Sequence, residues 1–194
     1  MRPVHTLPLV AAFVLAAAAL GGCQREPSAE EQRFLASLGD TSITVYPAYV
    51  RVGRSARFDA GSADRIAAFL RDEKLADVTR SDAQPDLDRG WHRNQSAMWR
   101  ESCDAFAEFV QANPPQTEYA LIAEYLKGAE QGAAGGVHVY VLTREGAQAF
   151  GMLLNSHHQV FRDVTPSTPD ECTTAAIREL KRRLDAERPK AKTP

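Results

Sequence analysis

The stretch "SITVYPAYVRV", residues 42–52, is rich in β-branched and aromatic residues and predicts a β-strand. Pro47 lies inside this stretch and cannot donate a backbone hydrogen bond, which indicates a bulge or an edge position. Residues 58–75, "FDAGSADRIAAFLRDEKL", repeat apolar side chains at helical spacing, with Ser62 as the expected N-cap. "ADVTR", residues 76–80, predicts a second short strand, so the whole segment predicts a βαβ unit or a close relative.

The rest of the chain alternates extended and helical patterns. A polar loop over residues 81–95 precedes a predicted helix over residues 96–112, which two prolines then end. Extended patterns predict an antiparallel meander over residues 117–127, 137–143, 147–154 and 158–164. A last helix begins at a capping box formed by Thr168 and Glu171, and its apolar stripe continues to Leu184.

These elements predict one α/β or α+β domain over residues 39–184. We expect a mixed sheet of five or six strands, with about three helices packed mainly on one face. The length of 194 residues and the apolar share of 44% are typical of a single globular domain. Residues 185–194 have little apolar surface to bury, and we expect them to be disordered.

The N-terminus has the three-part plan of a secretory signal. Arg2 and His5 precede an apolar run from Leu7 to Leu20, and small residues follow. Fourteen helical residues span about 21 Å, which is short of the roughly 30 Å hydrocarbon core of a bilayer. The pattern therefore favours a cleaved signal peptide over a permanent transmembrane helix.

Residues 20–23, Leu-Gly-Gly-Cys, resemble the lipobox of bacterial lipoproteins. In that family the cysteine thiol receives a diacylglyceryl group, the signal is removed before the cysteine, and the new amine is acylated. The resemblance implies that residues 1–22 are a signal peptide and that Cys23 anchors the chain in a bilayer. Gln24, in place of Asp, implies the outer membrane, with the domain facing the periplasm. The alternative is an ordinary signal peptide in which Cys23 has no such role.

Residues 23–38 are then expected to be the acylated cysteine and a flexible tether. Residues 24–32, "QREPSAEEQ", are polar and charged, and Pro27 interrupts them. When fully extended, this stretch reaches about 30 Å. Such a tether would let the domain float clear of the bilayer.

Cys103 and Cys172 remain in the mature chain. In an oxidising periplasm an even pair favours a disulfide over a metal site, which needs more ligands at closer spacing. Two helices on the same sheet face would bring these two thiols together. The alternative is a pair of buried free thiols.

The sequence "LLNSHHQVF" places Ser156 beside His157 and His158, which suggests a nucleophile and a base. Adjacent residues of an extended chain point to opposite faces, and no GxSxG elbow precedes the serine, so we assign no catalytic residue. Metal binding by these histidines with His138 lacks an HExxH motif or other ligand spacing, so we expect no metal and no cofactor. Three acidic residues before Gly90 lack the order of a calcium loop and predict a solvated loop: Asp82, Asp86 and Asp88.

Tyrosines from several predicted strands offer a different kind of site. With helices on one sheet face only, the open face would carry Tyr46, Tyr140 and either Tyr119 or Tyr125, with His138 between them. Tyrosine combines apolar area with a polar tip and suits protein recognition. The alternative is that these rings belong to the core, because the strand register is open. The net charge of −2 argues against nucleic acid as a partner.

The layout of residues 43–53, "ITVYPAYVRVG", followed by residues 62–70, "SADRIAAFL", resembles a known group of small periplasmic α/β lipoprotein domains. These are related to the amino-terminal domain of TolB and to the penicillin-binding-protein activator LpoB. The glycine-rich segment over residues 128–136 departs from that layout. The resemblance implies a non-catalytic binding or accessory protein with an envelope protein as its partner. The alternative is a periplasmic hydrolase or metal-dependent enzyme that uses residues 156–158.

Overall fold

The computed structural model describes residues 28–187 except residues 54, 89–93 and 128–133. The predicted signal peptide, Cys23 and most of the predicted tether lie outside the described residues, as does most of the predicted tail. Among the described residues, no helix combines the length and apolar composition that a membrane span requires.

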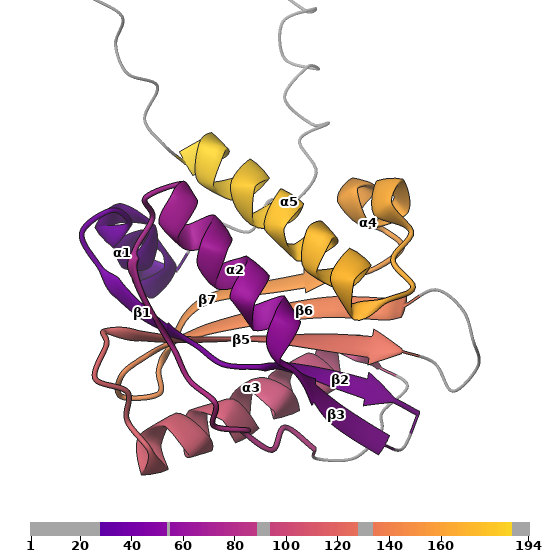
Figure 1. Cartoon of the computed structure of the whole chain (residues 1–194), viewed down its shortest axis with the longest axis horizontal. Helices are drawn as coiled ribbons and strands as arrows, with labels where there is room; N and C mark the ends of the chain where they lie inside the picture. Colours follow the sequence, from indigo (N-terminus) through magenta and orange to yellow (C-terminus); the bar gives the residue numbers. More distant parts are fainter. Residues whose placement is uncertain (1–27, 54, 89–93, 128–133, 188–194) are drawn as a thin grey trace, which may run out of the picture.

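A mixed sheet of seven strands forms the centre of the molecule (Figure 1). The strands are β1 (Ser42–Val45), β2 (Ala48–Val52), β3 (Ser55–Asp59), β4 (Asp77–Arg80), β5 (Tyr119–Lys127), β6 (Ala134–Thr143) and β7 (Gln148–Leu154). On one side of β5, strands β6 and β7 follow as an antiparallel meander. On its other side, β1 pairs with the first part of β5 and β2 with the last part, both in parallel. Outside them, β4 runs parallel to β1 and β3 antiparallel to β2.

The predicted strand over residues 42–52 is interrupted at Tyr46 and Pro47. Ile43 pairs with Tyr119 and Tyr49 with Glu124, so the register along β5 shifts by one residue across the interruption. Because side chains alternate along a strand, this shift reverses which face each later residue reaches. The prediction was a bulge or an edge position at Pro47. The structure instead has a break there that divides the stretch into two strands with different outer neighbours.

Helices cover both faces of the sheet. They are α1 (Ala29–Ser37), α2 (Ala60–Asp72), α3 (Gln95–Ala112), α4 (Gln159–Val164) and α5 (Pro169–Glu187). In Figure 1, α2 and α5 lie above the sheet, and α3 alone lies below it. The predicted fold class is confirmed, with seven strands in place of five or six and five helices in place of about three. The expected open face is covered by α3.

Two apolar cores follow from this arrangement, one on each face of the sheet. The larger core joins the sheet to α1, α2, α4 and α5 and contains Phe34, Ile66, Phe161 and Leu180. The smaller core joins the other face to α3 and contains Tyr46, Phe106 and Tyr140. Burial on both faces accounts for the long apolar runs in β5 and β6.

The expectation of a flexible tether up to residue 38 is wrong from Ala29 onward. Ser28 caps α1 by accepting a hydrogen bond from the Glu31 backbone N–H at 3.1 Å. The ring of Phe34 is buried, with its centroid 5.0 Å from that of Tyr119 and 5.7 Å from that of Phe150. One buried aromatic residue holds a helix whose other residues are mostly polar, which is why composition alone suggested a tether.

Two boundaries near helices also differ from the prediction. Residues 158–164 form α4 and not a strand, and Arg162 donates hydrogen bonds back to the carbonyls of Ser156 and His157 at 3.1 and 2.8 Å. The N-cap of α2 is Asp59, whose carboxylate accepts from the Ser62 backbone N–H at 2.8 Å. In both places a local side-chain hydrogen bond decides where the helix begins. The spacing of apolar residues gives no sign of such a hydrogen bond.

The predicted capping box of the last helix is confirmed. The Glu171 backbone N–H donates to Thr168 Oγ1 at 3.2 Å, and the Thr168 N–H donates to Glu171 Oε2 at 3.0 Å. The same carboxylate accepts from the Ser167 hydroxyl at 2.7 Å and its backbone N–H at 2.8 Å. The hydrogen bonds from Ser167 are the main reason why the pKa of Glu171 falls to about 2.

Candidate functional site

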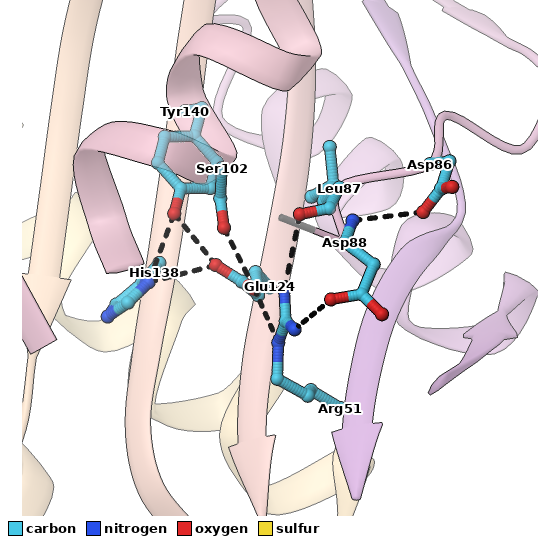
Figure 2. A network of polar contacts seen from close by, with 8 residues as sticks. All are labelled: Arg51, Asp86, Leu87, Asp88, Ser102, Glu124, His138 and Tyr140. Carbon is cyan, nitrogen blue, oxygen red and sulfur yellow. Dashed lines mark hydrogen bonds and ion pairs between the residues drawn. The ribbon is translucent and has the colours of Figure 1, made fainter. Parts of the chain in front are cut away.

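A cluster of polar side chains lies buried between the sheet and α3 (Figure 2). We call it the α3 polar cluster, and its members are Arg51 of β2, Ser102 of α3, Glu124 of β5, and His138 and Tyr140 of β6. The Glu124 and His138 residues are 0% exposed. Charged groups are seldom buried so completely unless they are paired, so the geometry of this cluster is informative.

Strand register brings the members together. Glu124 of β5 pairs directly with His138 of β6, and Tyr140 lies two residues further on the same face. Arg51 reaches this face because of the one-residue shift at the β1–β2 interruption. Without that shift, the alternation of β1 would direct Arg51 toward the larger apolar core.

Glu124 is the centre of the cluster, and its two carboxylate oxygens meet only donors. Oε1 accepts from Arg51 Nε at 3.3 Å and Nη2 at 3.2 Å, and from Ser102 Oγ at 3.1 Å. Oε2 accepts from the Tyr140 hydroxyl at 2.8 Å and lies 3.0 Å from His138 Nδ1. Five contacts of this kind hold an ionised carboxylate.

Arg51 extends the cluster to the loop that follows β4. Its Nη1 donates to Asp88 Oδ1 at 2.8 Å, and its Nη2 donates to the Leu87 carbonyl at 3.2 Å. Leu87 itself is buried in the smaller core. The acidic residues of this loop, Asp82, Asp86 and Asp88, are exposed as predicted. The exposed Asp88 carboxylate also pairs with Arg51 and helps to hold the loop against the sheet.

The pKa shifts in the cluster follow from burial and from these contacts. Burial alone would raise the pKa of Glu124. The hydrogen bond and charge interaction with His138, the hydrogen bond from Tyr140 and the charge on Arg51 together outweigh burial and lower the pKa. Burial raises the pKa of Tyr140 well above its usual range, and the neighbouring Glu124 charge adds to this effect. At neutral pH the cluster therefore contains a carboxylate and a neutral phenol.

The histidine tautomer follows from the donors around it. Tyr140 donates its hydroxyl proton to Glu124, so its oxygen is free to accept, and His138 Nδ1 lies 3.0 Å from both oxygens. Only an Nδ1–H is attracted to both oxygens, so Nδ1 of His138 carries a proton that is directed at them. Among the described residues, Nε2 is buried and has no hydrogen-bond partner. A carboxylate that orients a histidine in this way is common in general bases and metal sites, but this ring is fully buried.

The predicted recognition face is wrong. Tyr46 and Tyr140 share the predicted face with His138, but they are 4%, 0% and 0% exposed, respectively. The covering helix α3 packs Phe106 against Tyr46 and Trp99 against Tyr140, with ring centroids 5.6 Å apart in both pairs. Alternation along β6 correctly separated His138 from its valine neighbours, but it carries no information on whether a helix covers that side.

The other predicted tyrosines do not complete such a face. Tyr125 is buried in the larger core, on the opposite side of the sheet, where its hydroxyl lies 2.7 Å from Thr173 Oγ1. Tyr119 is partly buried and packs against that same core.

The serine and histidines of residues 156–158 lie in the turn before α4. Ser156 and His157 are exposed, and His158 directs Nδ1 toward Asn155, at 3.2 Å from both its backbone nitrogen and Oδ1. These contacts shape the turn and do not pair a nucleophile with a base. Within the described part of the chain, no group of three or more His, Cys, Asp or Glu is placed to hold a metal ion.

The predicted disulfide is also wrong. Cys103 and Cys172 are both free and buried. Cys103 belongs to the smaller core under α3 and Cys172 to the larger core under α5, so the sheet lies between the two thiols. The predicted pairing assumed that α3 and α5 lie on the same face of the sheet. They lie on opposite faces.

Comparison with protein-family models and with curated proteins found no match for this chain. The α3 polar cluster must therefore be interpreted from its own geometry. A sequence signal for it exists in "YALIAEYLK" and "AYVRV", where a single charge stands inside an otherwise apolar strand. A charge in such a position indicates a buried partner, but it does not say which residue that partner is.

Proposed function

We propose that this chain is a lipid-anchored accessory protein of the bacterial cell envelope that acts by binding a protein partner and not by catalysis. The observation that carries the proposal is the position of the Leu-Gly-Gly-Cys lipobox, residues 20–23, directly before the folded domain. Only the five residues from Gln24 to Ser28 separate Cys23 from the first residue of α1.

This short connection defines how the domain would sit. Five residues reach about 17 Å when fully extended, roughly half the reach of the tether expected from the sequence. The end of the domain that carries α1 would stay close to the bilayer, and the opposite end, with the turn before α4, would face away (Figure 1). We therefore place the partner-binding surface at the α4 end.

The α3 polar cluster supports an accessory role through its position. Arg51 of β2 and Glu124 of β5 tie two other segments to the sheet. These are the loop at Leu87 and Asp88, and α3 through Ser102. A network of this kind can specify how a covering helix docks, because any other position of α3 would leave buried charges unpaired. In this role His138 holds Glu124 and does not meet a substrate.

The lipid anchor is tested by mass spectrometry of the mature chain and by membrane fractionation. We expect Cys23 to be the first residue and to carry acyl chains, and we expect Cys23→Ser to leave the membrane fraction. Gln24→Asp is the matched variant, because it keeps the cysteine and should move the protein to the inner membrane. An unmodified N-terminus would contradict the proposal.

The partner is tested by site-specific photo-crosslinking in intact cells. A photoreactive residue at Gln159, which is exposed on α4, should capture one envelope protein reproducibly. The same group at Gln32, which is exposed on α1, is the matched control and should capture none of it. Equal capture from both positions, or none from Gln159, would contradict the assignment of the binding surface.

A further inference from the structure

The outer edge of β7 differs from the other edges of the sheet. Among the described residues, β7 pairs with β6 on one side and with no strand on the other. The other outer strands, β3 and β4, are shorter, and each carries two charges: Arg57 and Asp59 in β3, and Asp77 and Arg80 in β4. None of the seven residues of β7 is charged. Proteins protect edge strands by making them short or charged, so β7 is the edge that lacks this protection.

The second half of β7 directs backbone groups away from β6. Arg183 of α5 donates from Nη1 to the Gly151 carbonyl at 3.4 Å, so this carbonyl points out of the sheet. Because the direction of backbone groups alternates along a strand, the N–H and C=O of Leu153 point outward as well. Among the described residues, these two groups of Leu153 have no hydrogen-bond partner. The first half of β7 instead lies beside α1, where Phe34 packs on Phe150.

Positive charge is in excess on the α5 side of this edge. Arg182 and Arg183 both bind Glu179, at 2.6 and 3.1 Å, so two cations share one carboxylate. The contact from Arg183 to Gly151 is long for a hydrogen bond and therefore weak. A strand added to β7 would replace this contact with its own N–H, and Arg183 would then be free to bind a second carboxylate.

The α3 side of the edge is aromatic and apolar. The Trp99 indole fills the place that a side chain at residue 151 would take, since a Cβ added at Gly151 would lie 2.5 Å from Trp99 Cζ2. Leu153 lies on the same face as Gly151, and both Trp99 and Leu153 are only partly buried. Residues directly opposite each other on paired strands share a face, so an apolar residue opposite Gly151 would pack against the indole.

We propose that the second half of β7, residues 151–154, binds an extended segment of the partner protein in which acidic and apolar side chains alternate. The acidic side chains would face Arg182 and Arg183, and the apolar ones would face Trp99 and Leu153. The proposal rests on the proposed function, because it describes how that partner is held. The edge leads directly into the turn before α4, at the end of the domain where we place the partner-binding surface (Figure 1).

Charge argues against a second copy of this chain on the same edge. Two β7 strands paired antiparallel about a two-fold axis at Gly151 would bring both α5 helices to one face of the joined sheet. The Arg183 side chains of the two copies would then both lie beside the axis, because each reaches the Gly151 carbonyl. Like charges opposite each other destabilise strand pairing, whereas a segment with carboxylates would be attracted.

The test measures the binding of labelled synthetic peptides to the full lipidated chain in detergent micelles by fluorescence anisotropy. The acidic peptide is acetyl-TVEVEVT-amide, and its matched control has lysine in place of both glutamates. We expect the acidic peptide to bind about tenfold more tightly than the control. Arg182→Gln and Arg183→Gln should each weaken its binding about fivefold, while both variants keep the circular dichroism spectrum of the parent chain. Arg57→Gln, which removes a cation from the opposite edge, should leave the affinity unchanged.

N-methylation of the acidic peptide tests the main-chain pairing. Alternate residues of a strand direct their N–H groups to the same neighbour, so methylation of either the valines or the glutamates should abolish binding, and methylation of the other set should not. Equal effects of the two sets would overturn the proposal. So would equal binding of the acidic peptide and its lysine control, or no binding of the acidic peptide.

Two further results separate the remaining possibilities. A chain that dimerises in analytical ultracentrifugation, and whose dimer the acidic peptide disperses, would place a second copy on β7 and overturn the proposal. Failure of the proposed function is read separately, as an unmodified Cys23 or as absence of crosslinking from Gln159 in cells. The peptide measurement depends on neither result.

Discussion

Arg51 of β2 and Glu124 of β5 form an ion pair with 3.2 Å between Nη2 and Oε1, and their side chains are 5% and 0% exposed. The pair exists because the register along β5 shifts by one residue at Pro47. It joins the sheet to the loop after β4, through Asp88, and to α3, through Ser102. The contact between α3 and the sheet at Glu124 therefore depends on the interruption between β1 and β2, which lies more than forty residues before α3.

The first prediction concerns this pair. Glu124→Gln keeps the shape of the side chain but leaves Arg51 buried without its main counter-charge. We expect the free energy of unfolding to fall by about 3 kcal/mol, measured by urea denaturation, because breaking a buried pair leaves an uncompensated charge. Glu145→Gln removes a carboxylate from an exposed turn and should change the stability by less than about 0.5 kcal/mol. Similar effects from both variants would contradict the buried pair.

The second prediction concerns the Nδ1 proton of His138. Nitrogen-15 NMR should show a protonated Nδ1, because Nδ1 lies 3.0 Å from both Glu124 Oε2 and the Tyr140 hydroxyl. Tyr140→Phe removes one of these oxygens and the donor to Glu124, and it should leave Nδ1 as the protonated nitrogen. A spectrum in which Nδ1 carries no proton would contradict the hydrogen-bond directions assigned to the cluster.

The third prediction concerns the thiols. Burial raises the pKa of both Cys103 and Cys172 to about 12, so thiolate is scarce at neutral pH. We expect neither to react with a thiol reagent in the native chain and both to react within minutes in denaturant. A reductant should leave the thermal midpoint unchanged, because the sheet separates the two sulfurs. A lower midpoint after reduction would indicate the disulfide that the structure excludes.

The fourth prediction concerns the packing of α3 on β7. A Cβ added at Gly151 would lie 2.5 Å from Trp99 Cζ2, so Gly151→Ala forces the indole to move. We expect a loss of about 2 kcal/mol of stability, which is typical of an overpacked core. At Gly135 an added Cβ has its nearest contact at 3.6 Å, so Gly135→Ala is the matched control and should be nearly neutral. Trp99→Leu should relieve the penalty at Gly151; an unrelieved penalty would place its cause elsewhere.

The fifth prediction is an acid-dependent contribution from the capping box of α5. The pKa of Glu171 is about 2 in the folded chain against an ordinary value of 4.5. A lowered folded-state pKa stabilises the fold above the ordinary value and loses this contribution as the pH falls from about 4.5 to 2. The difference in thermal midpoint between the parent and Glu171→Gln should therefore shrink across this window. Thr168→Ala removes a cap that does not titrate, and its effect should persist; a constant difference for Glu171→Gln would contradict the shift.

Local pattern predicted most of the elements. The period of apolar residues indicated α2, α3 and α5. Extended patterns indicated β4, β5, β6 and β7, and they indicated β1 and β2 as one continuous strand. The local pattern failed to predict α1 and α4, because few residues in these helices carry a helical signal. One buried residue, Phe34, anchors α1, and the Arg162 side chain shapes the start of α4 by donating hydrogen bonds to the carbonyls of Ser156 and His157.

The candidate site was beyond such patterns. The alternation of β6 placed His138 and Tyr140 on one face, and that part of the prediction agrees with the structure. Whether that face is open or covered depends on which face of the sheet α3 packs against. The sequence of α3 does not indicate which face that is. The same uncertainty produced the wrong disulfide, since Cys103 was assumed to lie on the face of Cys172.

The sequence by itself determined the α/β class, the meander of β5, β6 and β7, and the capping box, because each depends on residues close together along the chain. Only the tertiary structure decided that both faces of the sheet are covered, that Arg51 meets Glu124, and that Cys103 and Cys172 lie in different cores. These depend on contacts between residues far apart in the chain. A shift of one residue in register exchanges the two faces, while the local pattern of each strand stays the same.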